Sequence, residues 1–186
     1  MQIPKKAKKV FQGTIFSVYQ WKQKMFDGTI ETFEMLKRPN TIQIIPIQGD
    51  KIIVSRQSQP HKFDYFSLFG GRAEEGEEPL ITAKRELLEE SGLVSDDWEL
   101  FNTYSFPHKI QWDVYFFIAR NCKKIADPKL DPGEKIQIIE YSFDEFQKAI
   151  EDDNYLAKDL ALDILKIEKA GKLEEFKKRL FRSYRT

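Results

Sequence analysis

One stretch of the chain, from Gly70 to Leu93, constrains the fold more than any other: GGRAEEGEEPLITAKRELLEESGL. Pro79 suits the first turn of a helix, where its missing N–H has no intrahelical partner. Gly92 suits the end, because glycine readily adopts the left-handed conformation that closes a last turn. The stretch therefore predicts a helix of about three turns at 3.6 residues each.

The predicted helix has an apolar face and an acidic face. Three residues at i, i+3 and i+7 form the stripe expected to face the core: Leu80, Ala83 and Leu87. Glu86, Glu89 and Glu90, at i, i+3 and i+4, place three carboxylates together on an adjoining face. Like charges at these spacings destabilise a helix by roughly a few tenths of a kcal/mol each.

These residues alone leave two interpretations of the acidic face. Most acidic helix faces are solvated, and three glutamates by themselves favour that interpretation. A hard divalent cation would reverse the repulsion, and Mg²⁺ typically uses a few carboxylates together with substrate phosphates. The framing glycines, Gly70-Gly71 before the loop and Gly92 after the helix, favour a cation site.

The composition narrows the class of protein. In the 186 residues, 30 basic and 30 acidic residues cancel, which leaves no electrostatic footprint for broad nucleic-acid binding. The longest apolar runs, such as Tyr115–Ala119, are too short to span a membrane. A single cysteine, Cys122, cannot form an internal disulfide. We expect one soluble, cytoplasmic domain with an appended element.

The rest of the chain predicts a mixed α/β sandwich. Asp27-Gly28 and Gly49-Asp50 each predict a hairpin turn between β-rich runs. Ser142, with Glu145 three residues later, predicts a capping box at the start of a helix. The expected strands are 13–21, 29–36, 41–47, 51–56, 98–106, 111–120 and 136–141. The expected later helices are 143–152, 156–169 and one after residue 171.

The glutamate-rich stretch resembles the Nudix box. That motif is glycine, five residues, glutamate, seven residues, Arg-Glu-aliphatic, one residue, Glu-Glu, one residue and Gly-aliphatic. The matching residues are Gly71, Glu77, Arg85, Glu86, Leu87, Glu89, Glu90, Gly92 and Leu93. Nine specified positions over 23 residues are far more specific than a lone glycine motif. The resemblance implies an α/β (α+β) fold, the Nudix α/β/α sandwich with a mixed sheet.

The resemblance also implies a reaction. Nudix enzymes use Mg²⁺ or Mn²⁺ and water to hydrolyse a nucleoside diphosphate linked to another group, and carboxylates suit such metals. The implied metal ligands are Glu86, Glu89, Glu90 and the backbone carbonyl of Gly70. Arg85 is expected to orient the glutamates and Glu77 to brace the loop, while Gly71 and Gly92 are structural.

Beyond the box, the chain resembles the ADP-ribose and nucleoside diphosphate-sugar pyrophosphatase branch. Residues 1–39 resemble its N-terminal β-hairpin extension, which leaves 40–186 as the Nudix domain with the C-terminal helices. Pro107, fifteen residues after Gly92, matches a proline of that branch.

The same resemblance places Glu134 in an acidic loop that adds a further metal ligand. The general base stays open among Glu134, Asp131 and Glu90.

Several positions depart from the branch. Gln57 and Gln59 stand where arginines are common, with Arg56 nearby, and all three are expected near the substrate phosphates. Ser67 stands where a glutamate is usual, and Pro132 replaces a residue that is acidic in some relatives. The departures favour a broader or altered choice, with nucleotide sugars at least as well supported as ADP-ribose.

Nucleoside recognition needs an apolar or aromatic face. The resembling branch binds the nucleoside with its hairpin and with the segment after the box. In this chain the hairpin contains Trp21 and Phe26, and the segment after the box contains Phe106 and His108. A hairpin is marginally stable alone, so we expect it to pack on a second subunit in a homodimer; packing on its own domain is the alternative.

Two other functions stay open. A housecleaning nucleoside triphosphatase is disfavoured by the extra hairpin. A catalytically idle Nudix module that binds a nucleotide or a protein is disfavoured because all the box glutamates are present.

Overall fold

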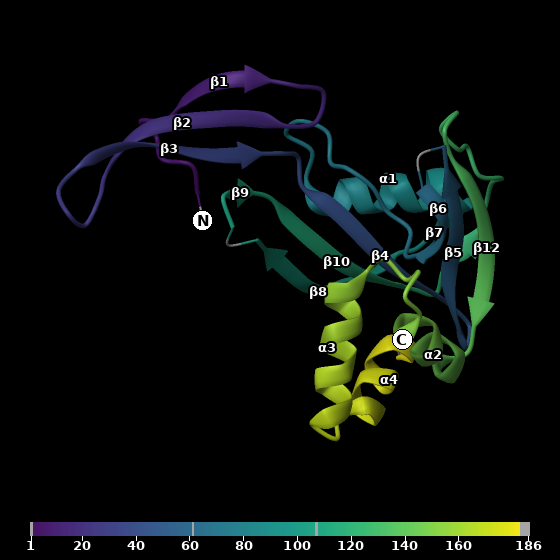
Figure 1. Cartoon of the computed structure of the whole chain (residues 1–186). Coiled ribbons are helices and arrows are strands. Elements are labelled where there is room, and N and C mark those ends of the chain that lie inside the picture. Colours follow the sequence, from purple (N-terminus) through teal and green to yellow (C-terminus); the bar gives the residue numbers. More distant parts are fainter. Residues whose placement is uncertain (1, 61, 107, 183–186) are drawn as a thin grey trace.

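The chain folds into three layers with a separate sheet to one side (Figure 1). The computed structural model describes residues 2–60, 62–106 and 108–182. Pro107, the proline matched by resemblance, lies outside the described residues. In the described part of the chain, no helix is both long and apolar enough to cross a membrane.

A mixed sheet forms the middle layer, with the strand order β12-β5-β4-β10-β8 and β6 attached to β5. Its strands are β4 (Thr41–Gln48), β5 (Lys51–Gln59), β6 (Lys62–Ser67), β8 (Asp97–Ser105), β10 (Asp113–Arg120) and β12 (Lys135–Tyr141). β4 and β10 are parallel, while the other pairs are antiparallel. The strands expected at 41–47, 51–56, 98–106 and 136–141 are confirmed, whereas β6 was not expected.

The sheet forks between β4 and β5. The expected turn is present, but the two strands pair only beside it, through Ile47 with Ile52 and Gln48 with Lys51. Past this point β5 pairs with β6, beginning at the Ser55–Ser67 pair. The chain after β6 then crosses to β4, where Phe69 pairs with Ile44. The following residues, 70 and 71, therefore lie at the fork.

Helix α1 (Pro79–Ser91) covers one face of the sheet and confirms the predicted helix. Its C-terminal residue Gly92 has φ 72° and donates its N–H to the carbonyl of Leu88. A side chain there would also meet the carbonyl of Ala126, because a Cβ would lie 1.9 Å from that oxygen. The core beneath α1 contains Ile42, Ile44, Ile53, Phe69, Ala83, Leu87, Phe117 and Ala119.

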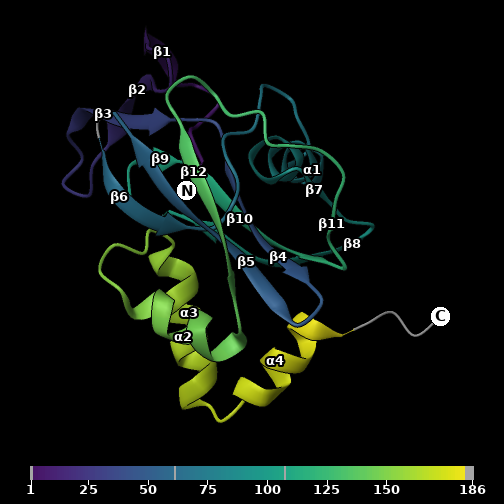
Figure 2. The same ribbon diagram turned by 90° about the vertical axis from the view of Figure 1, so that its right-hand side faces the viewer.

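Three helices cover the opposite face (Figure 2): α2 (Phe143–Glu151), α3 (Lys158–Lys169) and α4 (Leu173–Phe181). Ser142 and Glu145 form the predicted capping box at the start of α2. The core on this side includes Ile45, Ile52, Val54, Phe116, Ile118, Phe146, Leu160, Ile164 and Phe176. Two apolar cores on the two faces of one sheet confirm the predicted α/β/α sandwich.

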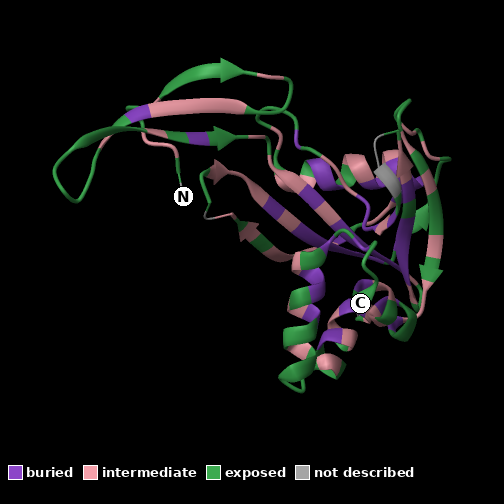
Figure 3. Ribbon diagram, viewed as in Figure 1, coloured by how far each residue is buried: buried purple, intermediate pink, exposed green. Residues whose placement is uncertain are grey.

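The N-terminal sheet has the order β1-β2-β3-β9 and extends away from the domain (Figure 1). Its strands are β1 (Lys8–Gln12), β2 (Ser17–Lys24), β3 (Ile30–Lys37) and β9 (Ile110–Gln111). The predicted turn at Asp27-Gly28 joins β2 and β3, where Met25 donates its N–H to the carbonyl of Thr29. β1 was not expected, and every residue in it is exposed (Figure 3).

Strand β9 shows where the sequence prediction was wrong. A single strand was expected over 111–120, but the chain breaks at Trp112. The two residues before the break pair in parallel with β3 of the extension, whereas those after it pair with β4 and β8. Trp112 is therefore a corner between two sheets and only half-buried. The remaining short pair, β7 (Leu93–Val94) with β11 (Lys123–Lys124), follows α1.

We expect the core on the α3 side to respond to truncation as close-packed cores do. Leu160 is fully buried, while Leu162 on the same helix is 52% exposed. Leu160→Ala should lower the free energy of unfolding by about 2–5 kcal/mol, whereas Leu162→Ala should change it by less than about 0.5 kcal/mol. Urea denaturation of both variants checks this, and equal losses would contradict the packing described.

Candidate functional site

Gly70 brings the fork of the sheet against the C-terminal half of α1. Its φ of 138° suits glycine, and a Cβ would lie 2.1 Å from the carbonyl oxygen of Ile42. Its backbone N–H donates to Oε2 of Glu90 at 2.8 Å. The loop and the helix are thus joined at a point where no side chain fits.

Arg85 organises three of the motif glutamates. Its Nη1 donates to Glu86 and to Glu89, each at 2.9 Å. Its Nε and Nη2 donate to the two carboxylate oxygens of Glu77, both at 3.1 Å. The Glu77 carboxylate also accepts from the N–H of Glu74 at 3.0 Å. The structure therefore places Arg85 and Glu77 where the resemblance expected an orienting residue and a loop brace.

Ionisation of Glu77 and Arg85 follows from this geometry. Hydrogen bonds from Arg85 lower the pKa of Glu77 to about 2. The hydrogen bond to Glu77 raises the pKa of Arg85 in turn, and the charge of Glu86 raises it further. This pair stays charged across the physiological range.

Glu86 lies against Gly71. A Cβ at Gly71 would fall 2.6 Å from the carboxylate carbon of Glu86, so the glycine makes room for the acid. Burial raises the pKa of Glu86, and the charges of Glu89 and Glu134 add to this, while Arg85 opposes it.

Glu90 is a buried carboxylate, only 6% exposed. Burial raises its pKa well above the ordinary value, the hydrogen bond from Gly70 opposes this, and the charges of Glu86, Glu134 and Glu89 raise it further. Glu134, from the loop before β12, is therefore within electrostatic reach of the motif carboxylates. Its own N–H donates to the carbonyl of Asp131 at 2.9 Å, so both candidate bases of that loop lie together.

The donor set fits a hard divalent cation. All the side-chain ligand atoms are carboxylate oxygens, and two of the carboxylates, Glu86 and Glu90, are shielded from water. Among the described residues, no positively charged side chain compensates the repulsion at Glu90. No three Asp, Glu, His or Cys side chains of the described residues are already gathered closely enough to enclose an ion. The carboxylates are kept apart because Arg85 forms ion pairs with Glu86 and Glu89, while Glu90 accepts a hydrogen bond from Gly70.

The predicted phosphate contacts on β5 are divided between two faces. Gln57 is buried, and its amide bonds with Tyr65 and Ser55. Arg56 points to the other face, where it pairs with Asp64 at 3.1 Å. Gln59 is half-buried at the end of the strand. The structure therefore does not gather these three side chains at the motif.

The predicted aromatic contacts are also dispersed. Trp21 is 8% exposed and packs against Phe33 with ring centroids 5.2 Å apart. Phe26 is fully exposed at the hairpin tip. Phe106 stacks on Trp112 at 4.4 Å, and His108 is exposed beside them. Nucleoside recognition by these residues stays a prediction.

Sequence reasoning missed two arginines beside the motif. Arg38 lies over the Trp112 ring at 4.4 Å and donates to Thr41, but its Nε is buried without a partner among the described residues. Burial lowers the pKa of Arg38, and the charge of Arg72 lowers it further. Arg72 pairs with Thr41 across the fork. No local pattern could reveal this meeting, because it requires the crossing from β5 to β4.

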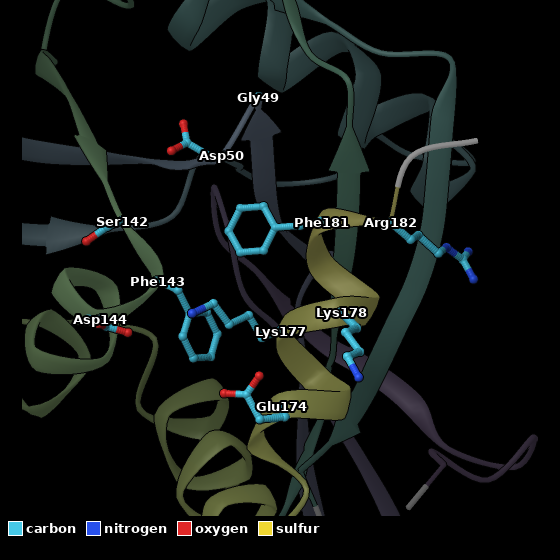
Figure 4. A pocket seen from close by; sticks show the side chains of 10 residues that line it. All are labelled: Gly49, Asp50, Ser142, Phe143, Asp144, Glu174, Lys177, Lys178, Phe181 and Arg182. Carbon is cyan, nitrogen blue, oxygen red and sulfur yellow. The ribbon is translucent and has the colours of Figure 1, made fainter. Parts of the chain in front are cut away.

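A hollow of about 840 Å³ lies at the other end of the molecule, between the β4–β5 turn, α2 and α4 (Figure 4). The Lys177 amine sits 5.2 Å from the ring of Phe143, and three acids, Asp50, Asp144 and Glu174, share the wall. Mixed charges and an open shape give it no convergent chemistry. None of the motif residues lines it.

Comparisons with known proteins agree with the geometry of the motif. The family model described as the NUDIX domain matches residues 37–160. An ADP-ribose pyrophosphatase of Bacillus subtilis (strain 168) is 25% identical over 146 residues, which cover 76% of this chain and 79% of that protein. A methanol dehydrogenase activator of Bacillus methanolicus is 24% identical over 144 residues, covering 75% and 78%.

A solved structure supports the fold. The crystal structure of an ADP compounds hydrolase superposes with a TM-score of 0.70 and 19% sequence identity. The match covers 89% of this chain and 94% of that one, so the two proteins share the fold over most of their length.

Removing the Glu90 charge should stabilise the metal-free protein. Folding raises the pKa of Glu90 above its ordinary value of 4.5. The Glu90 side chain therefore contributes its full stability below pH 4.5, and this stability is lost as the pH rises through the pKa of the folded state. Glu90→Gln cannot ionise and should melt higher than wild type at pH 8 in a chelator, with no difference at pH 4.5 or below. Glu75→Gln, in the exposed loop, is the charge-matched control. A lower melting temperature for Glu90→Gln at pH 8 would contradict the burial penalty.

Proposed function

Because this chain belongs to the Nudix family, we propose that it is a metal-dependent pyrophosphohydrolase acting on nucleoside diphosphates linked to another group, such as ADP-ribose or a nucleotide sugar. The products would be a nucleoside monophosphate and a sugar phosphate. The observation that carries this proposal is the placement of the water-shielded Glu86 and Glu90 carboxylates against Gly71 and Gly70, since the repulsion between two such groups favours binding of a cation.

The residues of the chain would divide the work. Glu86, Glu89, Glu90, Glu134 and the Gly70 carbonyl would hold Mg²⁺ or Mn²⁺. When bound, the metal supplies charge neutralisation at the diphosphate and a more acidic water. Arg85 keeps Glu86 and Glu89 oriented.

A proton acceptor for the attacking water must come from the same face. Glu134 and Asp131 are on one loop, and Glu90 is the buried alternative. Glu134 suits the role best, because its carboxylate is held more loosely: it accepts from the N–H of Asp131 at 3.4 Å, whereas the buried Glu90 carboxylate accepts from Gly70 at 2.8 Å.

Arg38 and Arg72 are the best placed residues for the substrate phosphates. The charge of Arg72 acts on Arg38, whose buried Nε has no hydrogen-bond partner among the described residues, and this arrangement favours an anion between or beside the two guanidinium groups. Phosphate is the anion that arginine's planar fork binds in two-point fashion. This assigns to Arg38 and Arg72 the function first expected from Arg56, Gln57 and Gln59.

The relatives support the substrate class. The Bacillus subtilis protein named ADP-ribose pyrophosphatase aligns over most of both chains. A triphosphatase would not require the extension, and an idle binding module would not require the intact carboxylate set. The natural nucleoside and sugar stay open within the proposed class.

We also propose a homodimer built through the N-terminal sheet. Among the described residues, eight of the fifteen exposed large hydrophobic side chains lie in this part of the chain: Val10, Phe11, Ile15, Phe16, Met25, Phe26, Ile30 and Leu36. So large an apolar share on a thin sheet favours burial against another copy. A partner surface could also bring the dispersed aromatic residues toward a substrate.

A substrate panel tests the proposed reaction. With Mg²⁺ or Mn²⁺, wild type should release nucleoside monophosphate from ADP-ribose, UDP-sugars or GDP-sugars. Glu90→Gln and Glu134→Gln should lower kcat at least about 100-fold, because each removes a carboxylate from the reacting face. Glu75→Gln should remain within about twofold.

Two results would count against this assignment. Cleavage of deoxynucleoside triphosphates alone would replace the substrate class with the housecleaning alternative. Full activity of Glu90→Gln at ordinary metal concentration would remove the carboxylate site itself.

The dimer is tested by mass in solution. Light scattering at micromolar concentration should give twice the 22.0 kDa chain mass. Phe11→Asp, on exposed β1, should shift the protein toward monomer, whereas Leu162→Asp, equally exposed on α3, should not. A monomeric wild type would rule out this interface.

A further inference from the structure

A row of buried polar side chains lies where apolar packing would be expected. Ile53 packs beneath α1, and alternate residues of a strand share a face, so Ser55 and Gln57 continue that row. Both are buried, at 0% and 8% exposure. On β6, Ser67 lies opposite Ser55 and Tyr65 lies opposite Gln57.

Three hydrogen bonds join these residues, which we call the polar chain. The Tyr65 hydroxyl donates to Oε1 of Gln57 at 2.9 Å. Nε2 of Gln57 donates to Oγ of Ser55 at 2.8 Å, and Oγ of Ser55 donates to the carbonyl of Ser67 at 3.0 Å. Each residue donates to the next, from Tyr65 to Ser67. Because the side chains are buried, removing one member leaves a polar atom of its neighbour without a partner.

The polar chain approaches the site at both ends. Burial raises the pKa of Tyr65, and the charges of Glu134 and Glu90 raise it further, so the Tyr65 hydroxyl is within electrostatic reach of both acids. At the other end, Ser67 is the last residue of β6 before the crossing to β4.

The crossing is held on its far side by the backbone. The N–H groups of Ile44 and Ile42 donate to the carbonyls of Phe69 and Gly71, each at 2.8 Å. The Ser55 hydroxyl fixes the near side at Ser67. Gly70 therefore lies between two backbone-bonded residues, and the Ser55 hydroxyl adds a side-chain hydrogen bond at the start of the crossing, where β5 and β6 also pair.

We propose that the polar chain is a positioning device for the metal ligands, which sets the Gly70 turn against Glu90. The inference rests on the metal-dependent part of the proposed function. It makes Gln57 a positioning residue, because both ends of its amide are engaged inside the protein. An aliphatic side chain at Ser55 or Gln57 would fill the layer but could not hold the crossing.

Metal affinity, measured without any nucleotide, tests the proposal. Calorimetric titration of metal-free protein with Mn²⁺ should show the dissociation constant rising about tenfold in Ser55→Ala, as for other groups that orient ligands. Tyr65→Phe, which removes only the hydroxyl, should weaken Mn²⁺ binding in the same direction by about threefold, because the remaining bonds persist.

Tyr104→Phe is the matched control. The Tyr104 hydroxyl also donates from a half-buried position, to Asp163 on α3, away from the motif. Its removal should leave Mn²⁺ affinity unchanged. In assays with substrate, Ser55→Ala should need more metal for half-maximal rate, while KM for the nucleotide at saturating metal stays near that of wild type.

The outcomes separate this inference from the proposed substrate. Unchanged Mn²⁺ affinity in Tyr65→Phe and Ser55→Ala overturns the inference, and Tyr65→Phe decides alone if Ser55→Ala does not fold. A loss of Mn²⁺ affinity in a protein that cleaves no nucleoside diphosphate derivative supports the positioning role and refutes the substrate. A wild type that binds no Mn²⁺ overturns both.

Discussion

The hydrogen bond from Gly70 to Glu90 is the contact on which the candidate site depends. It joins a loop at the fork of the sheet to the buried end of an acidic helix, at 2.8 Å. A carboxylate that is nearly removed from water needs donors close to it. One backbone N–H meets part of that need, and a cation would meet the rest.

The fork exists because β4 and β5 pair for only two residues on each strand. A continuous hairpin would have left no place for the crossing segment, and the motif loop would then have no fixed position over the sheet. β6 fills the opening on one side, and backbone bonds to Ile42 and Ile44 fill it on the other. The site is thus built from an interruption in a regular sheet.

Ion pairs with Arg85 hold the motif rigid, but they leave part of its negative charge uncompensated. Arg85 compensates Glu77, Glu86 and Glu89 through four hydrogen bonds. Glu90 has no such cation among the described residues, and burial raises its pKa. A site compensated throughout would have little affinity for a divalent ion, whereas one without Arg85 would spread its acids apart.

The sequence by itself determined α1, its caps, the three carboxylates on one face and the sandwich class, because helical spacing and cap chemistry are local properties. It also indicated Glu134, through resemblance. Only the tertiary structure decided that Gln57 faces inward, that Arg56 faces away and that Arg38 meets Arg72. Those outcomes depend on how strands β4, β5 and β6 diverge and pair, and pairing between distant segments is set by the packing of the whole sheet rather than by the residues near each site.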